Sequence, residues 1–60
     1  MGKKIKFFRK KNRFTQEEAA TILKIPLNTY RSYEQGKRVP RIDTFERIAK
    51  LYKCTIEDLI

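Results

Sequence analysis

The sequence has few of the residues that form disulfides or metal sites, which stabilise many very small folds. It contains one cysteine, Cys54, and no histidine. No disulfide can form within the chain, and a zinc site would lack its usual ligands. The lone thiol has no histidine to activate it and no paired-acid catalytic site is recognisable, so we expect no enzyme activity, no cofactor and no metal. A chain of 60 residues must then be held by packing alone, with Cys54 as a small buried apolar residue.

Long apolar runs, repeats and linkers are absent too. No stretch is apolar enough to span a bilayer. The basic start of the chain lacks the apolar segment that follows it in a signal peptide. We therefore expect a cytoplasmic protein with no membrane partner, and the length predicts one domain, residues 1–60.

Negative charge is scarce, and positive charge is concentrated in two segments. Lys and Arg number 15 against 7 Asp and Glu, which gives a net charge of +8. The first segment contains no acid, and its basic residues are Lys3, Lys4, Lys6, Arg9, Lys10, Lys11 and Arg13. The second comprises Lys37, Arg38 and Arg41. This excess favours a polyanionic partner, either nucleic acid or an anionic membrane surface.

Apolar residues recur at helical spacing along nearly the whole chain. The pattern predicts helices at about 3–11, 15–23, 26–34 and 42–52, with a short fifth helix after Thr55. Thr15 and Glu18 form a capping box, Pro26 suits the first turn of a new helix, and Gly36 suits a left-handed helix end. The predicted core residues are Ile5, Phe8, Ala19, Ala20, Leu23, Tyr30, Tyr33, Ile42, Phe45, Ile48, Ala49, Tyr52, Ile56 and Leu59.

Three local features carry further expectations. Asn12 and Arg13 mark the end of the first helix, because Asn tolerates a left-handed conformation. The tyrosine hydroxyls are expected to point toward solvent or backbone. The turn between the second and third helices is so short that the two must meet at a steep angle, as in helix-turn-helix units.

Several segments at matching separations resemble the Cro/C1-type (phage repressor-like) helix-turn-helix family from Ile5 to Leu59. They are Gln16-Glu17-Glu18-Ala19-Ala20, Ile25, Thr29, Tyr33-Glu34-Gln35-Gly36-Lys37-Arg38-Val39-Pro40 and Ile48-Ala49-Lys50. The resemblance implies an all-α, lambda repressor-like bundle of four to five helices, in which the helix at about residues 27–34 lies in the DNA major groove. The sequence departs from the family pattern at Lys24, where the family usually has glycine, and at Pro26, where Ser or Thr often caps the third helix.

The resemblance implies a sequence-specific transcriptional regulator of double-stranded DNA, and specifically a repressor. The residues expected to read bases are Leu27, Asn28, Thr29, Arg31 and Ser32, of which Asn28 suits adenine and Arg31 suits guanine or a phosphate. The residues expected to bind phosphates are Gln16, Lys37, Arg38 and Arg41, with Lys10 and Arg13 as weaker candidates. Arg9 and Glu34 are expected to form a partly buried structural ion pair.

Two questions about partners stay open at this stage. One recognition helix covers only a few base pairs, so specific binding needs a homodimer on a palindromic site or a larger chain. Phe7 falls off the apolar face of the first helix, and an exposed aromatic residue there favours an alternative function as an antitoxin-like or partner-binding module. A basic membrane-surface or RNA-binding peptide is a third reading, but such peptides do not need the capped, multi-helix pattern.

Overall fold

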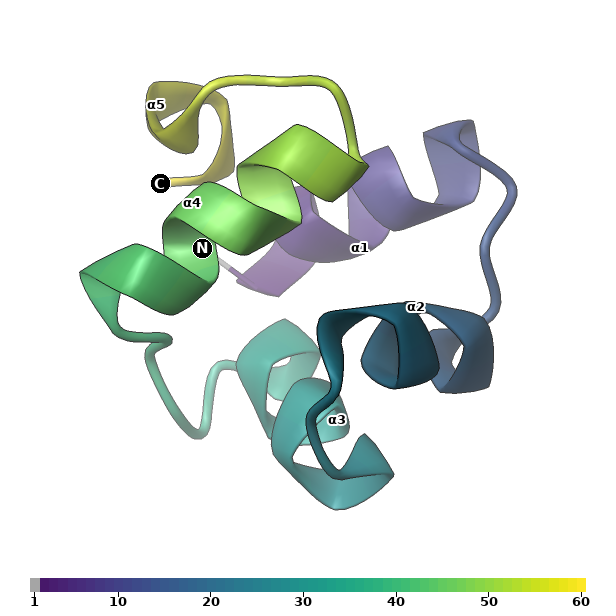
Figure 1. Cartoon of the computed structure of the whole chain (residues 1–60). Coiled ribbons are helices and arrows are strands. Elements are labelled where there is room, and N and C mark those ends of the chain that lie inside the picture. Colours follow the sequence, from purple (N-terminus) through teal and green to yellow (C-terminus); the bar gives the residue numbers. More distant parts are fainter. Residues whose placement is uncertain (1) are drawn as a thin grey trace.

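The computed structural model describes residues 2–60, which form helices without any strand. In chain order the helices are α1 (Gly2–Lys11), α2 (Gln16–Leu23), α3 (Leu27–Gln35), α4 (Ile42–Leu51) and α5 (Ile56–Leu59). In Figure 1, α2 and α3 occupy one end of the molecule, α4 crosses the middle in front of α1, and α5 lies at the other end. The predicted all-α bundle with five helical segments is therefore confirmed. No helix within this part of the chain is long and apolar enough to cross a membrane.

All five helices contribute to one core. Its buried apolar residues are Ile5, Ala19, Ala20, Leu23, Tyr30, Phe45, Ile48, Ala49, Tyr52 and Leu59. Tyr33 and Cys54 are only half-buried, although both pack against this cluster. The predicted core position of Ile42 is wrong, because its side chain is 66% exposed. Ile42 is the first residue of α4, and the buried residues of that helix are Phe45, Ile48 and Ala49. Pro40, two residues before Ile42, is buried.

The helix starts follow the capping signals of the sequence. Thr15 Oγ1 accepts from the amide of Glu18 at 3.0 Å, and Glu18 Oε1 accepts from the amide of Thr15 at 2.9 Å. Thr55 and Asp58 form the same reciprocal box at the start of α5. By contrast, α3 begins at Leu27, and Pro26 before it supplies no side-chain cap. Proline has no N–H, so one fewer amide is left without a partner at the start of the helix.

The helix ends use left-handed backbone at four residues, of which only one is glycine. Gly36 has φ 79°, while Arg13, Lys24 and Lys53 have φ 62°, 58° and 55°. The expectation for Asn12 is therefore corrected, because Arg13 takes the left-handed conformation in its place. Asn12 instead donates through Nδ2 to the carbonyl oxygens of Phe8 at 2.8 Å and Tyr52 at 3.1 Å.

Replacing Lys24 with glycine should stabilise the domain by about 0.5–1 kcal/mol. A left-handed L-residue costs roughly 1–2 kcal/mol, and the larger entropy loss of glycine on folding returns only part of that gain. In a domain of this size, thermal unfolding should show a rise of a few degrees in Tm. Lys24→Ala is the matched control, because it removes the same charge but keeps the Cβ. Equal Tm values for the two variants would contradict the expected relief of backbone strain.

Candidate nucleic-acid interface

The turn that joins α2 to α3 is closed by hydrogen bonds back to α2. The amide of Lys24 donates to the carbonyl oxygen of Thr21 at 3.1 Å, and the amide of Ile25 donates to that of Ala20 at 3.0 Å. Pro26 then takes an extended conformation, with φ −60° and ψ 143°. The chain therefore changes direction sharply between α2 and α3 (Figure 1). Arg31 and Glu34 of α3 then lie beside Gln16 at the start of α2.

Helix α3 has one face packed against the bundle and an opposite face, called the free face below, that is open to solvent. Tyr30 and Glu34 are buried against the bundle, whereas Asn28 and Arg31 are exposed. Thr29 and Ser32 are half-buried, and Ser32 Oγ donates to the carbonyl oxygen of Asn28 at 2.9 Å. The side-chain amide of Asn28 thus remains free on the outer surface of the helix.

Leu27 does not lie on the free face as expected. It is half-buried and packs against the core cluster. The reason is helical spacing, since Tyr30 and Glu34 follow it by three and seven residues and therefore share its side of α3. The expectation that Leu27 reads bases is weakened accordingly, because much of its surface is already covered.

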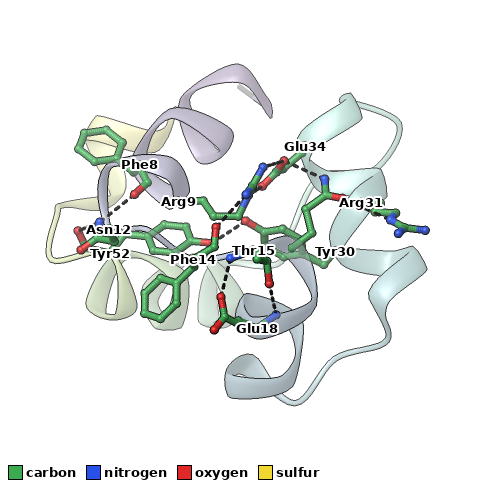
Figure 2. A network of polar contacts seen from close by, with 11 residues as sticks. Phe8, Arg9, Asn12, Phe14, Thr15, Glu18, Tyr30, Arg31, Glu34 and Tyr52 are labelled. Atoms are coloured by element: carbon green, nitrogen blue, oxygen red, sulfur yellow. Dashed lines mark hydrogen bonds and ion pairs between the residues drawn. The ribbon is translucent and has the colours of Figure 1, made fainter.

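A buried carboxylate joins α1 to α3. Glu34 Oε2 accepts from Arg9 Nε at 2.7 Å, and Glu34 Oε1 accepts from Arg9 Nη2 at 3.3 Å. Arg9 Nη1 also donates to the carbonyl oxygen of Phe14 at 2.8 Å, which fixes the loop before α2 (Figure 2). Burial alone would raise the pKa of Glu34, but the hydrogen bond from Arg9, together with smaller effects of Tyr30, Gln16 and the charge of Arg9, outweighs it and lowers the pKa. The pKa of Arg9 is raised, chiefly by its hydrogen bond to Glu34.

Gln16 connects this buried pair to the surface. Its Nε2 donates to Glu34 Oε1 at 3.0 Å, and its Oε1 accepts from Arg31 Nε at 3.3 Å. The sequence expectation gave Gln16 only a phosphate role and missed this bridge. The bond from Gln16 to Glu34 could have been expected, because a carboxylate has more acceptor positions than one guanidinium fills. Nothing in the sequence pattern indicates that Gln16 also contacts Arg31.

The tyrosine hydroxyls correct another expectation. Those of Tyr30 and Tyr52 lie 2.5 Å apart in the core and hydrogen-bond to each other, away from solvent. Burial raises the pKa of both residues, that of Tyr52 to about 12. Both hydroxyls therefore stay neutral at ordinary pH, and their bond ties α3 to the end of α4.

The loop after α3 presents the second basic segment. The amides of Lys37 and Arg38 donate to the carbonyl oxygen of Ser32 at 3.0 and 3.3 Å, which ties the start of the loop to the end of α3. Lys37, Arg38 and Arg41 are all exposed. The half-buried Gln16 at the start of α2, the free face of α3 and this loop thus supply polar and basic groups. An exposed helix flanked by such groups is typical of proteins that read a DNA groove and hold its phosphates.

Comparison with known proteins gives the same assignment. A family model described as helix-turn-helix matches residues 5–59. The chain belongs to this family. The predicted resemblance to Cro/C1-type proteins is thereby confirmed, and α2 and α3 are the paired helices of the motif.

Two curated relatives in the helix-turn-helix family are transcriptional regulators by name. The cryptic phage CTXphi transcriptional repressor RstR of Vibrio cholerae is 37% identical over 57 residues, which covers 95% of this chain and 51% of the relative. The HTH-type transcriptional regulator ImmR of Bacillus subtilis (strain 168) is 37% identical over 60 residues, which covers 100% of this chain and 47% of the relative. The chain thus spans about half the length of these relatives. No solved structure is significantly similar to it.

Proposed function

We propose that residues 1–60 form one sequence-specific DNA-binding domain of a transcriptional repressor, with α3 in the major groove. The observation that carries the proposal is the free face of α3. Asn28 and Arg31 are exposed there, between the start of α2 and a loop with three unburied basic residues. The relatives named as a repressor and as a transcriptional regulator support the same function.

The chemistry of each group fits a part of a duplex. The side chain of Asn28 can pair with the two major-groove edge groups of adenine, and Arg31 can pair with those of guanine. Gln16 uses one amide hydrogen on Glu34, which leaves the second for a phosphate at the positive end of α2. Lys37, Arg38 and Arg41 bind phosphates on the other side of the groove. Thr29 and Ser32 supply smaller base contacts, and Leu27 supplies the residual apolar surface it retains.

Selection from a library of random duplexes tests this function. We expect the protein to enrich a short motif in repeated rounds, since base contacts discriminate by about 1–3 kcal/mol each. Two copies of the motif related by a dyad, with centres about 34 Å apart, would identify a homodimer. If the duplexes recovered after repeated rounds share no motif and bind no better than the starting pool, sequence-specific recognition is contradicted.

A partner-binding function is the second candidate, and Phe7 is the observation that favours it. Its side chain is 60% exposed, and its ring contacts that of Phe8 edge to face, with centroids 5.2 Å apart. A protein partner that covers Phe7 would bury this apolar surface. Phe7→Ser should then release a co-purifying partner while leaving duplex binding unchanged. A partner retained by the variant would contradict docking at this residue.

A further inference from the structure

Helix α1 carries basic residues on two sides, and one side is engaged by the chain itself. Lys4 Nζ donates to the carbonyl oxygen of Ile60 at 2.6 Å. Lys11 Nζ lies 5.7 Å from the centroid of the Phe8 ring. Both lysines also lower the pKa of Asp58, after the larger effect of the hydrogen bonds from Thr55. This side of α1 therefore faces α5.

The other side of α1 carries a row of free positive charge, formed by Lys6, Lys10 and Arg13. Lys6 and Lys10 are four residues apart and share one face of α1. Arg13 follows in the left-handed turn just past the end of that helix, and all three side chains are exposed. Within residues 2–60 the only ion pair joins Arg9 to Glu34, so the row has no acidic partner there. Three like charges in a line repel one another and are stabilised by an external anion.

The row lies along the edge where α1 meets the proposed DNA-binding helices. A Cβ at Gly2 would collide with the carbonyl oxygens of Tyr33 and Glu34, so the start of α1 touches the end of α3. Lys6 follows Gly2 by one turn and precedes Arg9, which holds Glu34. Arg13 follows Arg9 by four residues and lies in the loop between α1 and α2. The row is thus next to the stripe that contacts α3, and opposite to the side that faces α5.

We propose that Lys6, Lys10 and Arg13 bind phosphates of the same duplex whose major groove receives α3. The proposal rests on the proposed function and adds a third set of backbone contacts to it. From Lys6 to Lys10 the helix rises about 6 Å, at 1.5 Å per residue, and Arg13 continues the row past the end of the helix. The rise between the two lysines matches that of about two nucleotides on one strand, at 3.4 Å each. The row therefore follows one strand of the duplex beside the start of α2.

Salt dependence of binding tests the proposal. The probe is a mixed-sequence duplex two helical turns long, and the measurement is fluorescence anisotropy over a range of salt concentrations. Each phosphate contact contributes about −0.9 to the slope of log K against log salt. We expect Lys6→Ala/Lys10→Ala to make the slope shallower by about 1.8, and Arg13→Asn to make it shallower by about 0.9. Alanine favours helix and asparagine tolerates the left-handed position, so these variants should fold, as circular dichroism can verify.

The matched control is Lys4→Ala/Lys11→Ala, which removes the same net charge from the side of α1 that faces α5. We expect its slope to equal that of the wild type. Equal slopes for the two double variants, with the wild type binding in a salt-dependent manner, would overturn this proposal and leave the proposed function standing. A wild type that binds no duplex would overturn the proposed function itself.

Discussion

Glu34→Ala should destabilise the domain by about 3–5 kcal/mol, which is comparable with the whole stability expected of 60 residues. The substitution strands the guanidinium of Arg9, which is buried between α1 and α3. It also removes the acceptor of Gln16. Urea unfolding followed by circular dichroism measures the loss, and we expect most molecules to be unfolded at 37 °C before urea is added.

A double variant separates the lost charge pair from lost packing. Arg9→Met/Glu34→Leu removes both charges together and keeps apolar bulk, and replacement of a buried pair in this way is often neutral or stabilising. We expect it to recover most of the stability that Glu34→Ala loses. A double variant as unstable as Glu34→Ala would refute the explanation by a stranded charge and would assign the loss to packing or geometry.

The same carboxylate should make stability depend on acidity. Because the pKa of Glu34 is lower in the folded protein than its ordinary value of 4.5, the unfolded state binds the proton more readily. The stabilisation from Glu34 is thus complete above pH 4.5 and is lost as the pH falls through the lower, folded pKa. In Arg9→Met/Glu34→Leu this part of the acid sensitivity should disappear, which pH-dependent urea midpoints would reveal.

Asn28→Ala should reduce discrimination among duplexes by about 1–3 kcal/mol, or five- to 150-fold, at one position of the bound site. The side chain of Asn28 is exposed, and Ser32 bonds only to its backbone carbonyl oxygen, so the side-chain amide is available to a base. Competition between the selected duplex and single-base variants measures the effect. Stability should change by less than about 0.5 kcal/mol, as for most surface substitutions.

Arg38→Ala provides the contrast, because a phosphate contact carries no base information. It should weaken binding to every duplex by a similar factor and make the salt slope shallower by about 0.9. The ranking of duplexes should stay as in the wild type. If Arg38→Ala reordered the sequences while Asn28→Ala weakened all of them alike, the division between reading and positioning residues would be reversed.

The sequence predicted those features of the fold that depend on local periodicity and capping. The box at Thr15 and the left-handed end at Gly36 follow from neighbouring residue types, and the structure contains both. Ile42 was misplaced because periodicity shows which side of a helix is apolar, but not whether neighbouring elements cover its first residue. Leu27 was placed with the exposed residues of α3, although its spacing of three to Tyr30 puts both on one side of the helix.

The side-chain network was harder to predict, because it depends on tertiary geometry. The resemblance implied that Arg9 and Glu34 pair, but the bridge through Gln16 to Arg31 requires the start of α2 to lie beside the middle of α3. The bond between Tyr30 and Tyr52 likewise joins residues 22 positions apart. No local pattern specifies that two hydroxyls will meet in the core.

Because one face of α3 is packed and the other is free, residues on the two faces differ in how readily evolution can exchange them. Tyr30 and Glu34 hold the helix in place, while Asn28 on the opposite side bonds nothing through its side chain. Under the proposed function, exchanges at that outer position would retarget the domain to a new operator without loss of foldability. Arg31 is less free, because a replacement there also releases Gln16. New specificities should thus arise most readily through Asn28, with the rest of the scaffold inherited unchanged.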